Sequence, residues 1–302
     1  MLNRRSFLKS VGVAGTGIAL SPGLSAIKNP GNDRFKLSLA EWSFHRAIQA
    51  NTMTNLEFPI VTRELGIEAV EFVNTMFMDK ARDMVYLKEL KTICNQEGVK
   101  PLLIMCDSEG TIGHPDKTER IKTVGNHKKW VDAAAFLGCH SIRINAGSEG
   151  SYEERQKLVS DGFRLLCDYG TEKKINILIE NHGGLSSNGQ WLSEIMEIVK
   201  HERAGTLPDF GNFLVNKETG EQYDRYLGIK QLMPYAKGVS AKSVAFDKDG
   251  NETSTDYFRM MRIVKDSGYS GYIGIEYSGS EISEKEGVIA TKKLIERAIQ
   301  AL

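Results

Sequence analysis

Eight short apolar runs alternate with longer amphipathic stretches along this chain of 302 residues, and this alternation restricts the fold more than any other feature. The apolar runs predict strands at residues 36–42, 69–73, 100–106, 141–145, 175–180, 205–209, 237–242 and 272–276. Helical periodicity is expected at residues 84–96, 117–137, 151–173, 190–201, 223–235, 255–267 and 283–301. Strands that alternate with helices form a parallel sheet. Eight such units predict an α/β fold, a single closed (β/α)8 barrel.

A doubly wound open sheet is the alternative, but no glycine-rich dinucleotide fingerprint follows the first strand. No linker or low-complexity stretch divides the chain, which favours one domain. Glycines stand where helices are expected to end before the next strand, at Gly66, Gly98, Gly138 and Gly268.

The first 26 residues are set apart from the barrel by their composition. Arg4 and Arg5 precede an uncharged apolar run at 11–20 and a small, turn-rich segment at 21–26. The run is shorter than the ~20 residues that span a bilayer, which predicts an export signal rather than a membrane anchor. It resembles a twin-arginine signal, which implies export of the folded protein to the periplasm. An amphipathic first helix is the alternative, but the run has no polar face. The barrel is expected over residues 27–302.

Charge and cysteine content exclude two classes of function. The 39 Lys and Arg residues balance 39 Asp and Glu residues, so the chain has no net charge with which to bind nucleic acid. The four cysteines show no CxxC spacing, which argues against a zinc cluster or a redox pair. We expect buried, inert thiols, with a disulfide in the oxidising periplasm as the alternative. The oligomeric state stays open, and an oligomer is compatible with the sequence.

Polar side chains close several of the expected strands. Glu180 ends the fifth strand, Asp209 the sixth and Glu276 the eighth, while Ser240 and Lys242 share one face of the seventh. These positions are about one βα unit apart, so equivalent strand ends are used. In a barrel, the carboxyl ends of the strands surround one small volume, where active sites are found.

Three carboxylates that converge on one volume repel one another unless a positive charge lies between them. A divalent cation and Lys242 are the two available partners, and oxygen ligands favour Mg²⁺, Mn²⁺ or a similar hard ion. The predicted ligands are Glu180, Asp209 and Glu276, with Ser240 beside them. The alternative is that each acid caps a neighbouring helix or pairs with a surface base.

The order of Glu on strand five, Asp on strand six and Glu on strand eight resembles the xylose isomerase-like barrel superfamily of sugar and sugar-phosphate isomerases and epimerases. In that family a His usually closes strand seven, in a pattern like HVHxKD. Here the segment is GVSAKS, with Ser240 at the His position, Lys242 kept and Ser243 in place of Asp. Ser240 is therefore a direct ligand, a residue that holds a ligating water, or not involved. Asn212 stands where a second His often follows the strand-six Asp.

The resemblance implies removal of a proton next to a carbonyl, assisted by a divalent metal, through an enediolate. Glu180 and Glu276 would act as base and acid on opposite sides of a sugar, and Asp209 would only hold metal. His182 is a candidate for proton transfer with a sugar hydroxyl, or else fixes its own loop. Lys242 would orient a substrate oxygen, or else form a structural ion pair.

The candidate contacts to the small sugar substrate are Trp42, Arg143, Asn145 and Asn212. Near strand one, Glu41, Trp42 and His45 are placed to form a wall, and the aromatic face of Trp42 suits apolar sugar surfaces. Core packing explains Trp42 equally well. Arg143 and Asn145 alternate on strand four, facing the barrel mouth or bonding within the barrel. Asn212 completes the set.

Three other functions stay open or are disfavoured. Dehydration of a keto-sugar or keto-inositol would use the same enediolate. A barrel that has lost its metal would only bind sugar in the periplasm, without catalysis. The reason to consider this function is that Ser240 stands where the family usually has a His. An apurinic-site nuclease is disfavoured by the zero net charge and the absence of a multi-His cluster.

Two acidic loops have simpler interpretations than ion binding. Residues 247–252, DKDGNE, lack the spacing of a calcium loop and predict a hairpin turn at Asp249-Gly250. Residues 107–110 are interpreted as a solvated loop after strand three, available as a lid.

Overall fold

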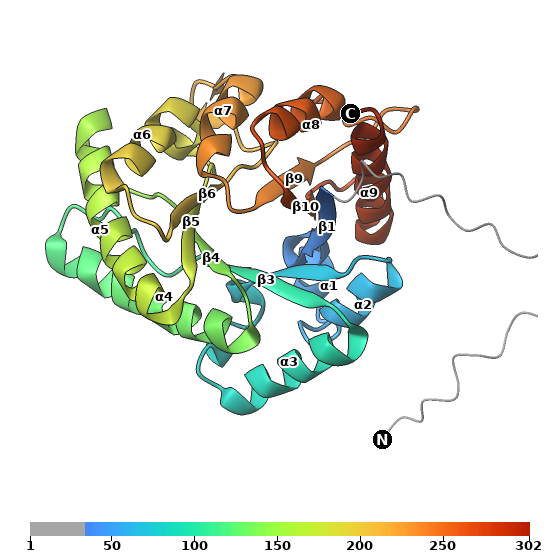
Figure 1. Cartoon of the computed structure of the whole chain (residues 1–302), viewed down its shortest axis with the longest axis horizontal. Coiled ribbons are helices and arrows are strands. Elements are labelled where there is room, and N and C mark those ends of the chain that lie inside the picture. Colours follow the sequence, from blue (N-terminus) through green and yellow to red (C-terminus); the bar gives the residue numbers. More distant parts are fainter. Residues whose placement is uncertain (1–33) are drawn as a thin grey trace, which may run out of the picture. The chain divides into compact units, whose positions relative to one another are not determined.

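The computed structural model describes residues 34–302, and the predicted export signal lies outside them. Figure 1 shows a ring of strands with helices packed around it. Each predicted apolar run forms one strand of the ring, which confirms the (β/α)8 prediction. The strands are β1 (Phe35–Ala40), β2 (Ala69–Val73), β3 (Lys100–Met105), β4 (Ser141–Ile144), β5 (Asn176–Glu180), β6 (Ala204–Leu207), β9 (Val239–Ser243) and β10 (Gly271–Tyr277).

The ring closes at the site predicted from the strand ends. The parallel sheet runs in the order β6-β5-β4-β3-β2-β1-β10-β9, and its two end strands meet through isolated parallel bridges, one of them between Asp209 and Ser240. The backbone N–H of Ser240 donates to the Pro208 carbonyl at 2.9 Å, and the N–H of Phe210 donates to the Ser240 carbonyl at 3.0 Å. Barrel closure therefore holds Asp209 and Ser240 side by side.

The helices begin and end where their sequences provide caps. Ser151 and Ser283 each form a capping box with a glutamate three residues later. Gly98 and Gly138 end helices in the left-handed conformation, with φ of +65° and +89°, as predicted. The helices are α1 (His45–Gln49), α2 (Phe58–Glu64), α3 (Met84–Glu97), α4 (Lys117–Leu137), α5 (Tyr152–Lys173), α6 (Gly189–Val199), α7 (Arg225–Leu232), α8 (Tyr257–Asp266) and α9 (Glu284–Gln300).

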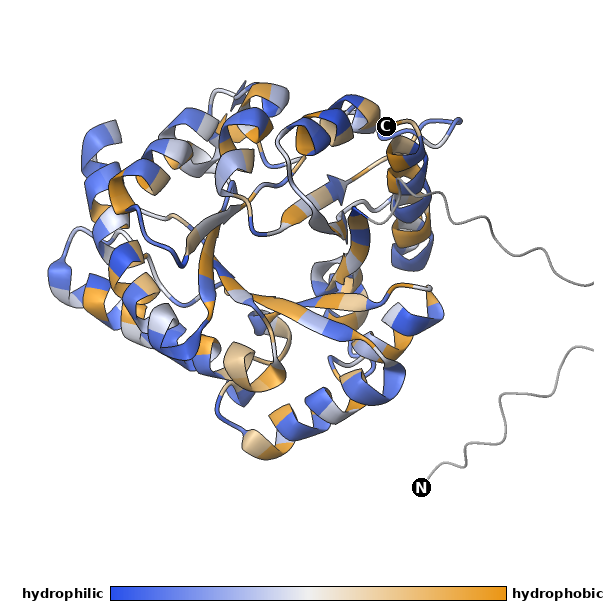
Figure 2. Ribbon diagram, viewed as in Figure 1, coloured by the Kyte–Doolittle hydropathy of each residue, from blue (hydrophilic) through white to orange (hydrophobic). Residues whose placement is uncertain are grey.

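The apolar core has two parts. The larger lies between the strands and the helices, along which hydrophilic and hydrophobic residues alternate in Figure 2. The smaller lies inside the barrel. Polar groups share that interior, because Ser38 donates to Glu71 Oε1 at 2.6 Å and Arg143 is also buried. The inside of the barrel therefore holds polar as well as apolar side chains. Among residues 34–302, no helix combines the length and the apolar character needed to cross a membrane.

The structure differs from the predicted elements at the points where the chain leaves a strand. Strand one ends at Ala40, and Glu41–Phe44 forms a 3-10 helix instead of continuing the strand to residue 42. Strand six ends at Leu207, so Asp209 stands in the loop after it. A small antiparallel hairpin that the apolar pattern did not predict follows, made of β7 (Leu214–Asn216) and β8 (Glu221–Gln222).

Two smaller predictions are confirmed. All four cysteines are buried and free, and burial raises the pKa of each thiol. The segment 247–252 forms a turn in which Phe246 and Glu252 pair as an antiparallel bridge and Gly250 has φ of +74°.

Candidate active site

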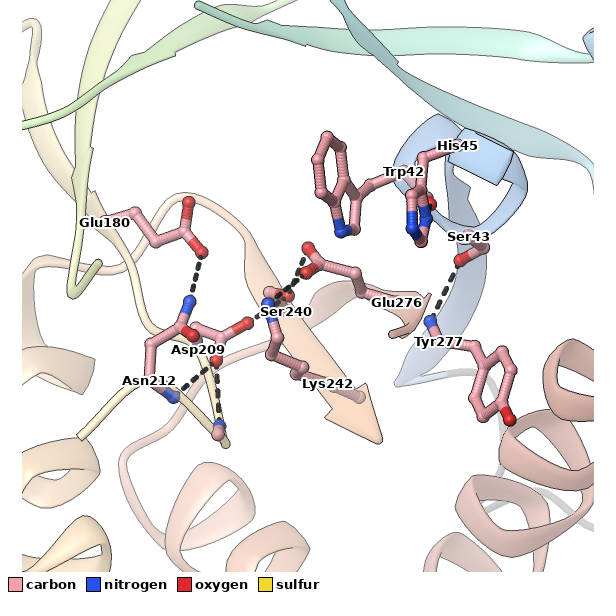
Figure 3. A network of polar contacts seen from close by, with 12 residues as sticks. Trp42, Ser43, His45, Glu180, Asp209, Asn212, Ser240, Lys242, Glu276 and Tyr277 are labelled. Carbon is pink, nitrogen blue, oxygen red and sulfur yellow. Dashed lines mark hydrogen bonds and ion pairs between the residues drawn. The ribbon is translucent and has the colours of Figure 1, made fainter. Parts of the chain in front are cut away.

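Glu180, Asp209 and Glu276 converge at the carboxyl ends of the strands. Glu180 is the last residue of β5, Glu276 is the next-to-last of β10, and Asp209 follows β6 by two residues. One carboxylate oxygen of each lies within 4.8 Å of the other two, and none of the three residues is more than 4% exposed. Figure 3 shows the carboxylates of Glu180 and Glu276 approaching from different strands, with Asp209 between them. The convergence predicted from the strand ends is therefore present.

Asp209 is held rigidly by its own loop. Its Oδ1 accepts from the backbone N–H groups of Gly211 at 2.8 Å and Asn212 at 2.9 Å. Its Oδ2 accepts from the Ser240 hydroxyl at 2.7 Å. The Asn181 side chain accepts from the Asp209 N–H at 2.7 Å and donates to the Asp209 carbonyl at 2.9 Å. Both the side chain and the backbone of Asp209 are thus fixed before any ligand arrives.

Glu180 has one oxygen without an aligned hydrogen-bond donor. Its Oε1 accepts from Asn212 Nδ2 at 3.1 Å. Its Oε2 is buried and lies 2.7 Å from Arg143 Nε, an ion pair without the alignment of a hydrogen bond. A buried carboxylate oxygen in this state retains the capacity to coordinate a cation.

Glu276 pairs with the face of β9. Its Oε1 accepts from Lys242 Nζ at 2.6 Å, and its Oε2 lies 3.4 Å from the Ser240 hydroxyl. Ser240 therefore bridges Asp209 and Glu276 as a hydrogen-bond donor. Lys242 thus forms an ion pair, which was the alternative to its orienting a substrate oxygen. Its partner in that pair, Glu276, is itself a predicted site residue.

The protonation of these groups reflects burial and their mutual charge. Burial raises the pKa of Glu180 to about 7 against the opposing effect of Arg143, and it raises the pKa of Asp209 to about 7 against that of Lys242. Burial also acts on Glu276, but Lys242 beside it holds the pKa of that carboxyl below its ordinary value. Neighbouring carboxylates in turn raise the pKa of Lys242 despite its burial.

Charge balance and donor chemistry both fit a divalent cation. Asp107, Glu180, Asp209 and Glu276 face two cationic side chains, Arg143 and Lys242, which leaves two negative charges uncompensated when all four acids are ionised. The ligand atoms are carboxylate oxygens, which hard ions such as Mg²⁺ and Mn²⁺ prefer. The residues that could hold such an ion are Glu180, Asp209 and Glu276.

A cavity of about 120 Å³ adjoins the three carboxylates, of which Glu276 lines it and Glu180 and Asp209 do not. It is lined by four predicted site residues besides Glu276. These are Trp42, Arg143, His182 and Lys242. The Trp42 ring stacks on His45, with ring centroids 4.6 Å apart, and forms one wall of the cavity beside Glu276 (Figure 3). Burial and then Arg143 lower the pKa of His182, which favours a neutral imidazole there.

Two predicted substrate contacts bond to protein groups instead. Asn212 donates to Glu180, as described above, and so orients a carboxylate. Asn145 donates to Asp107 Oδ1 at 2.7 Å and accepts from Arg143 Nη1 at 3.2 Å, and it does not line the cavity. For Asn145, the alternative of bonding within the barrel describes the structure better than the predicted substrate contact.

Asp107 is the residue that sequence reasoning missed. Residues 107–110 form a loop in which Ser108 and Gly110 are exposed, but the interpretation as a solvated loop is wrong for Asp107, which pairs with Arg143 Nη1 at 2.7 Å and lines the cavity. Its neighbour Glu109 is only 6% exposed and accepts from Trp130 Nε1 at 2.5 Å. Asp107 follows β3 directly, so the rule that selected the other acids at strand ends would have found it.

Comparisons with known proteins identify the family and the fold. Residues 61–302 match the family described as xylose isomerase-like TIM barrel. None of the curated proteins matches the chain in sequence.

Solved structures match nearly the whole chain at low identity. A 3-keto-D-glucoside 4-epimerase from E. coli is 14% identical, with a TM-score of 0.64 over 86% of this chain and 98% of its own. D-psicose 3-epimerase from Clostridium cellulolyticum H10, solved with D-tagatose, is 10% identical, with a TM-score of 0.67 over 87% and 99%. A xylose isomerase-like protein from Mycobacterium smegmatis, in complex with magnesium, is 16% identical, with a TM-score of 0.65 over 88% and 96%. These likenesses show the fold, and the family match over most of the chain shows that it belongs to the xylose isomerase-like TIM barrel family.

Proposed function

We propose that this protein is a carbohydrate isomerase or epimerase that removes a proton next to a carbonyl and depends on a divalent metal. The observation that carries the proposal is the convergence of three buried carboxylates, from three strand ends, one of which, Glu276, lines a cavity together with Trp42. Two of the similar structures described above are sugar epimerases. The family match and these epimerases support a carbohydrate-processing enzyme.

Glu180, Asp209 and Glu276 would hold the metal, and magnesium in one similar structure supports a hard divalent ion. A bound cation of this kind would supply Lewis-acid polarisation of the substrate carbonyl and the adjacent hydroxyl. The hydrogen bonds that Asp209 accepts from Gly211, Asn212 and Ser240 fix the orientation of its carboxylate among the three proposed ligands.

Proton transfer is assigned to the two glutamates. Lys242 occupies Glu276 Oε1, which leaves Oε2 with only a 3.4 Å contact to Ser240 and free to take a proton from the sugar carbon. Glu180 approaches from a different strand, which suits delivery of a proton to the opposite side of the substrate. His182 lines the same cavity and in its neutral form exchanges a proton with a sugar hydroxyl. Trp42 covers the apolar surface of the sugar ring.

The test is solvent deuterium exchange into a panel of keto and aldo sugars, with Mn²⁺ or Mg²⁺ present. Glu276→Gln should reduce exchange of the proton next to the carbonyl by about 100-fold or more, the usual contribution of a positioned general base. Glu281→Gln, at an exposed position beyond the same strand, is the matched control and should leave exchange unchanged. Unchanged exchange in Glu276→Gln would remove that residue from the mechanism.

The same assay addresses the alternatives. A keto-sugar dehydratase would remove the proton next to the carbonyl and a hydroxyl group from the substrate as water, so its product would be lighter by one water molecule. A sugar-binding barrel without catalysis would bind sugar and show no exchange in the wild type. Export to the periplasm through residues 1–26 stays a prediction.

A further inference from the structure

A second cavity, of about 170 Å³, lies beside the candidate active site, and Lys242 lines both cavities. The β7–β8 hairpin contributes Leu214 and Gln222 to its wall, and Arg225 enters from the first residue of α7. Val244, which is 48% exposed, closes the side nearest β9. The hairpin that the apolar pattern did not predict therefore forms part of a second cavity, which shares Lys242 with the first.

The second cavity combines hydrogen-bond donors, acceptors and apolar surface. Arg225 donates to the Thr255 hydroxyl, and a guanidinium keeps further N–H groups for a ligand. Glu252 brings a carboxylate whose Oε2 accepts from the backbone N–H groups of Ser254 at 2.7 Å and Thr255 at 2.5 Å. Leu214 and Val244 supply apolar contact.

This mixture suits a neutral, hydroxylated ring better than an anion. A hydroxyl both donates and accepts, so it is satisfied by Arg225 and Glu252 together, while the C–H groups of a sugar ring pack against apolar side chains. Of the two cations in the lining, Lys242 is already paired with Glu276, and a carboxylate or phosphate that approached Arg225 would also meet the negative charge of Glu252. The shared wall at Lys242 places such a ring next to the sugar bound in the first cavity.

We propose that the second cavity is a subsite for a sugar ring joined by a glycosidic bond to the reacting sugar. The substrates would then be glycosides or disaccharides rather than free monosaccharides. This inference rests on the proposed function, because it takes the first cavity to be the site of the reacting sugar.

The test is equilibrium binding by ligand-observed NMR with metal-loaded enzyme. The probes are maltose, cellobiose, lactose and trehalose, each compared with its component monosaccharides, D-glucose and D-galactose. At least one disaccharide should bind at least tenfold more tightly than its components. Equal affinities for all disaccharides and monosaccharides would overturn the proposal.

Variants locate the preference in the second cavity. Arg225→Ala should reduce the ratio between monosaccharide and disaccharide dissociation constants to about one. Val244→Trp, at an exposed position, should do the same by filling the cavity, and it carries the test alone if Arg225→Ala fails to fold. Arg262→Ala, on the exposed face of α8, is the matched control and should keep the ratio. A ratio that survives both Arg225→Ala and Val244→Trp would overturn the subsite.

Failure of the subsite and failure of the proposed reaction give different results. A disaccharide preference that depends on Arg225, without any proton exchange, would refute the reaction and retain the subsite. Exchange in free monosaccharides, without a disaccharide preference, would refute the subsite and retain the reaction.

Discussion

Glu41 makes the stability of the barrel depend on pH in a way that one substitution isolates. This carboxyl, in the 3-10 helix after β1, is fully buried. Its Oε1 accepts from Asn55 Nδ2 at 2.6 Å and its Oε2 from the Val73 N–H at 2.8 Å. Burial raises the pKa of Glu41 to about 8, and the two hydrogen bonds offset the effect of burial only in part.

The folded state therefore binds this proton more tightly than the unfolded chain does. The stability that protonated Glu41 provides is complete below its ordinary pKa of 4.5, and it is lost as the pH rises through about 8. At about 1.36 kcal/mol for each pKa unit, the wild type should lose about 3 kcal/mol of unfolding free energy between pH 6 and pH 9 through this group alone.

Glu41→Gln replaces the carboxyl with an amide of the same shape that does not titrate. Its Nε2 cannot accept one of the two hydrogen bonds, which lowers the stability of the variant equally at both pH values. Urea unfolding of both proteins at pH 6 and pH 9 measures the difference in their free energies of unfolding. Between pH 6 and pH 9, the free energy of unfolding of Glu41→Gln relative to that of the wild type should rise by about 3 kcal/mol, because all other titrating groups are common to both proteins. Glu64→Gln, at an exposed position, is the control and should show no shift. A difference between wild type and Glu41→Gln that stays constant within about 1 kcal/mol would refute the assignment.

Two further predictions concern Asp209. Asn181→Ala removes three hydrogen bonds that hold the backbone of Asp209 and Asn212, so urea unfolding should show a loss of about 1–3 kcal/mol or more, whereas Asn95→Ala on the exposed face of α3 should cost far less. Mn²⁺ at about 100 times its dissociation constant should add about 2.7 kcal/mol to the stability of the wild type. This gain should disappear in Asp209→Asn, and a melting temperature that rises equally in both proteins would contradict a site at Asp209.

The sequence predicts the barrel because apolar runs alternate with amphipathic stretches, and it predicts the three central acids because they stand at the ends of those runs. Glu180, Asp209 and Glu276 each stand at or just beyond the end of an apolar run, and the barrel topology brings such ends together. The role of Asn181 is not readable in the same way, since it bonds to the backbone of a different loop. The contacts of Asp107 likewise depend on a neighbouring strand, although its own position was visible.

The β7–β8 hairpin escaped prediction for a different reason. Its two strands have three and two residues and lie in a polar, glycine-containing loop, so they leave no apolar alternation to detect. The cavity that this hairpin builds depends on side chains from α7 and from the loop after β9, which are distant in sequence. Substrate selection in a barrel therefore lies largely in segments whose structure the periodicity of the chain does not encode.

Ser240 explains how this site differs from the family pattern that its sequence resembles. Its hydroxyl donates to Asp209 at 2.7 Å and lies 3.4 Å from Glu276, so it bonds to two acids where a histidine would offer a nitrogen ligand. Lys242, two residues further along the same strand, neutralises Glu276. Because this strand offers no histidine nitrogen as a metal ligand, an ion held by Glu180, Asp209 and Glu276 would have only oxygen ligands from the protein. Such a donor set selects Mg²⁺ or Mn²⁺ over ions that prefer imidazole or thiolate.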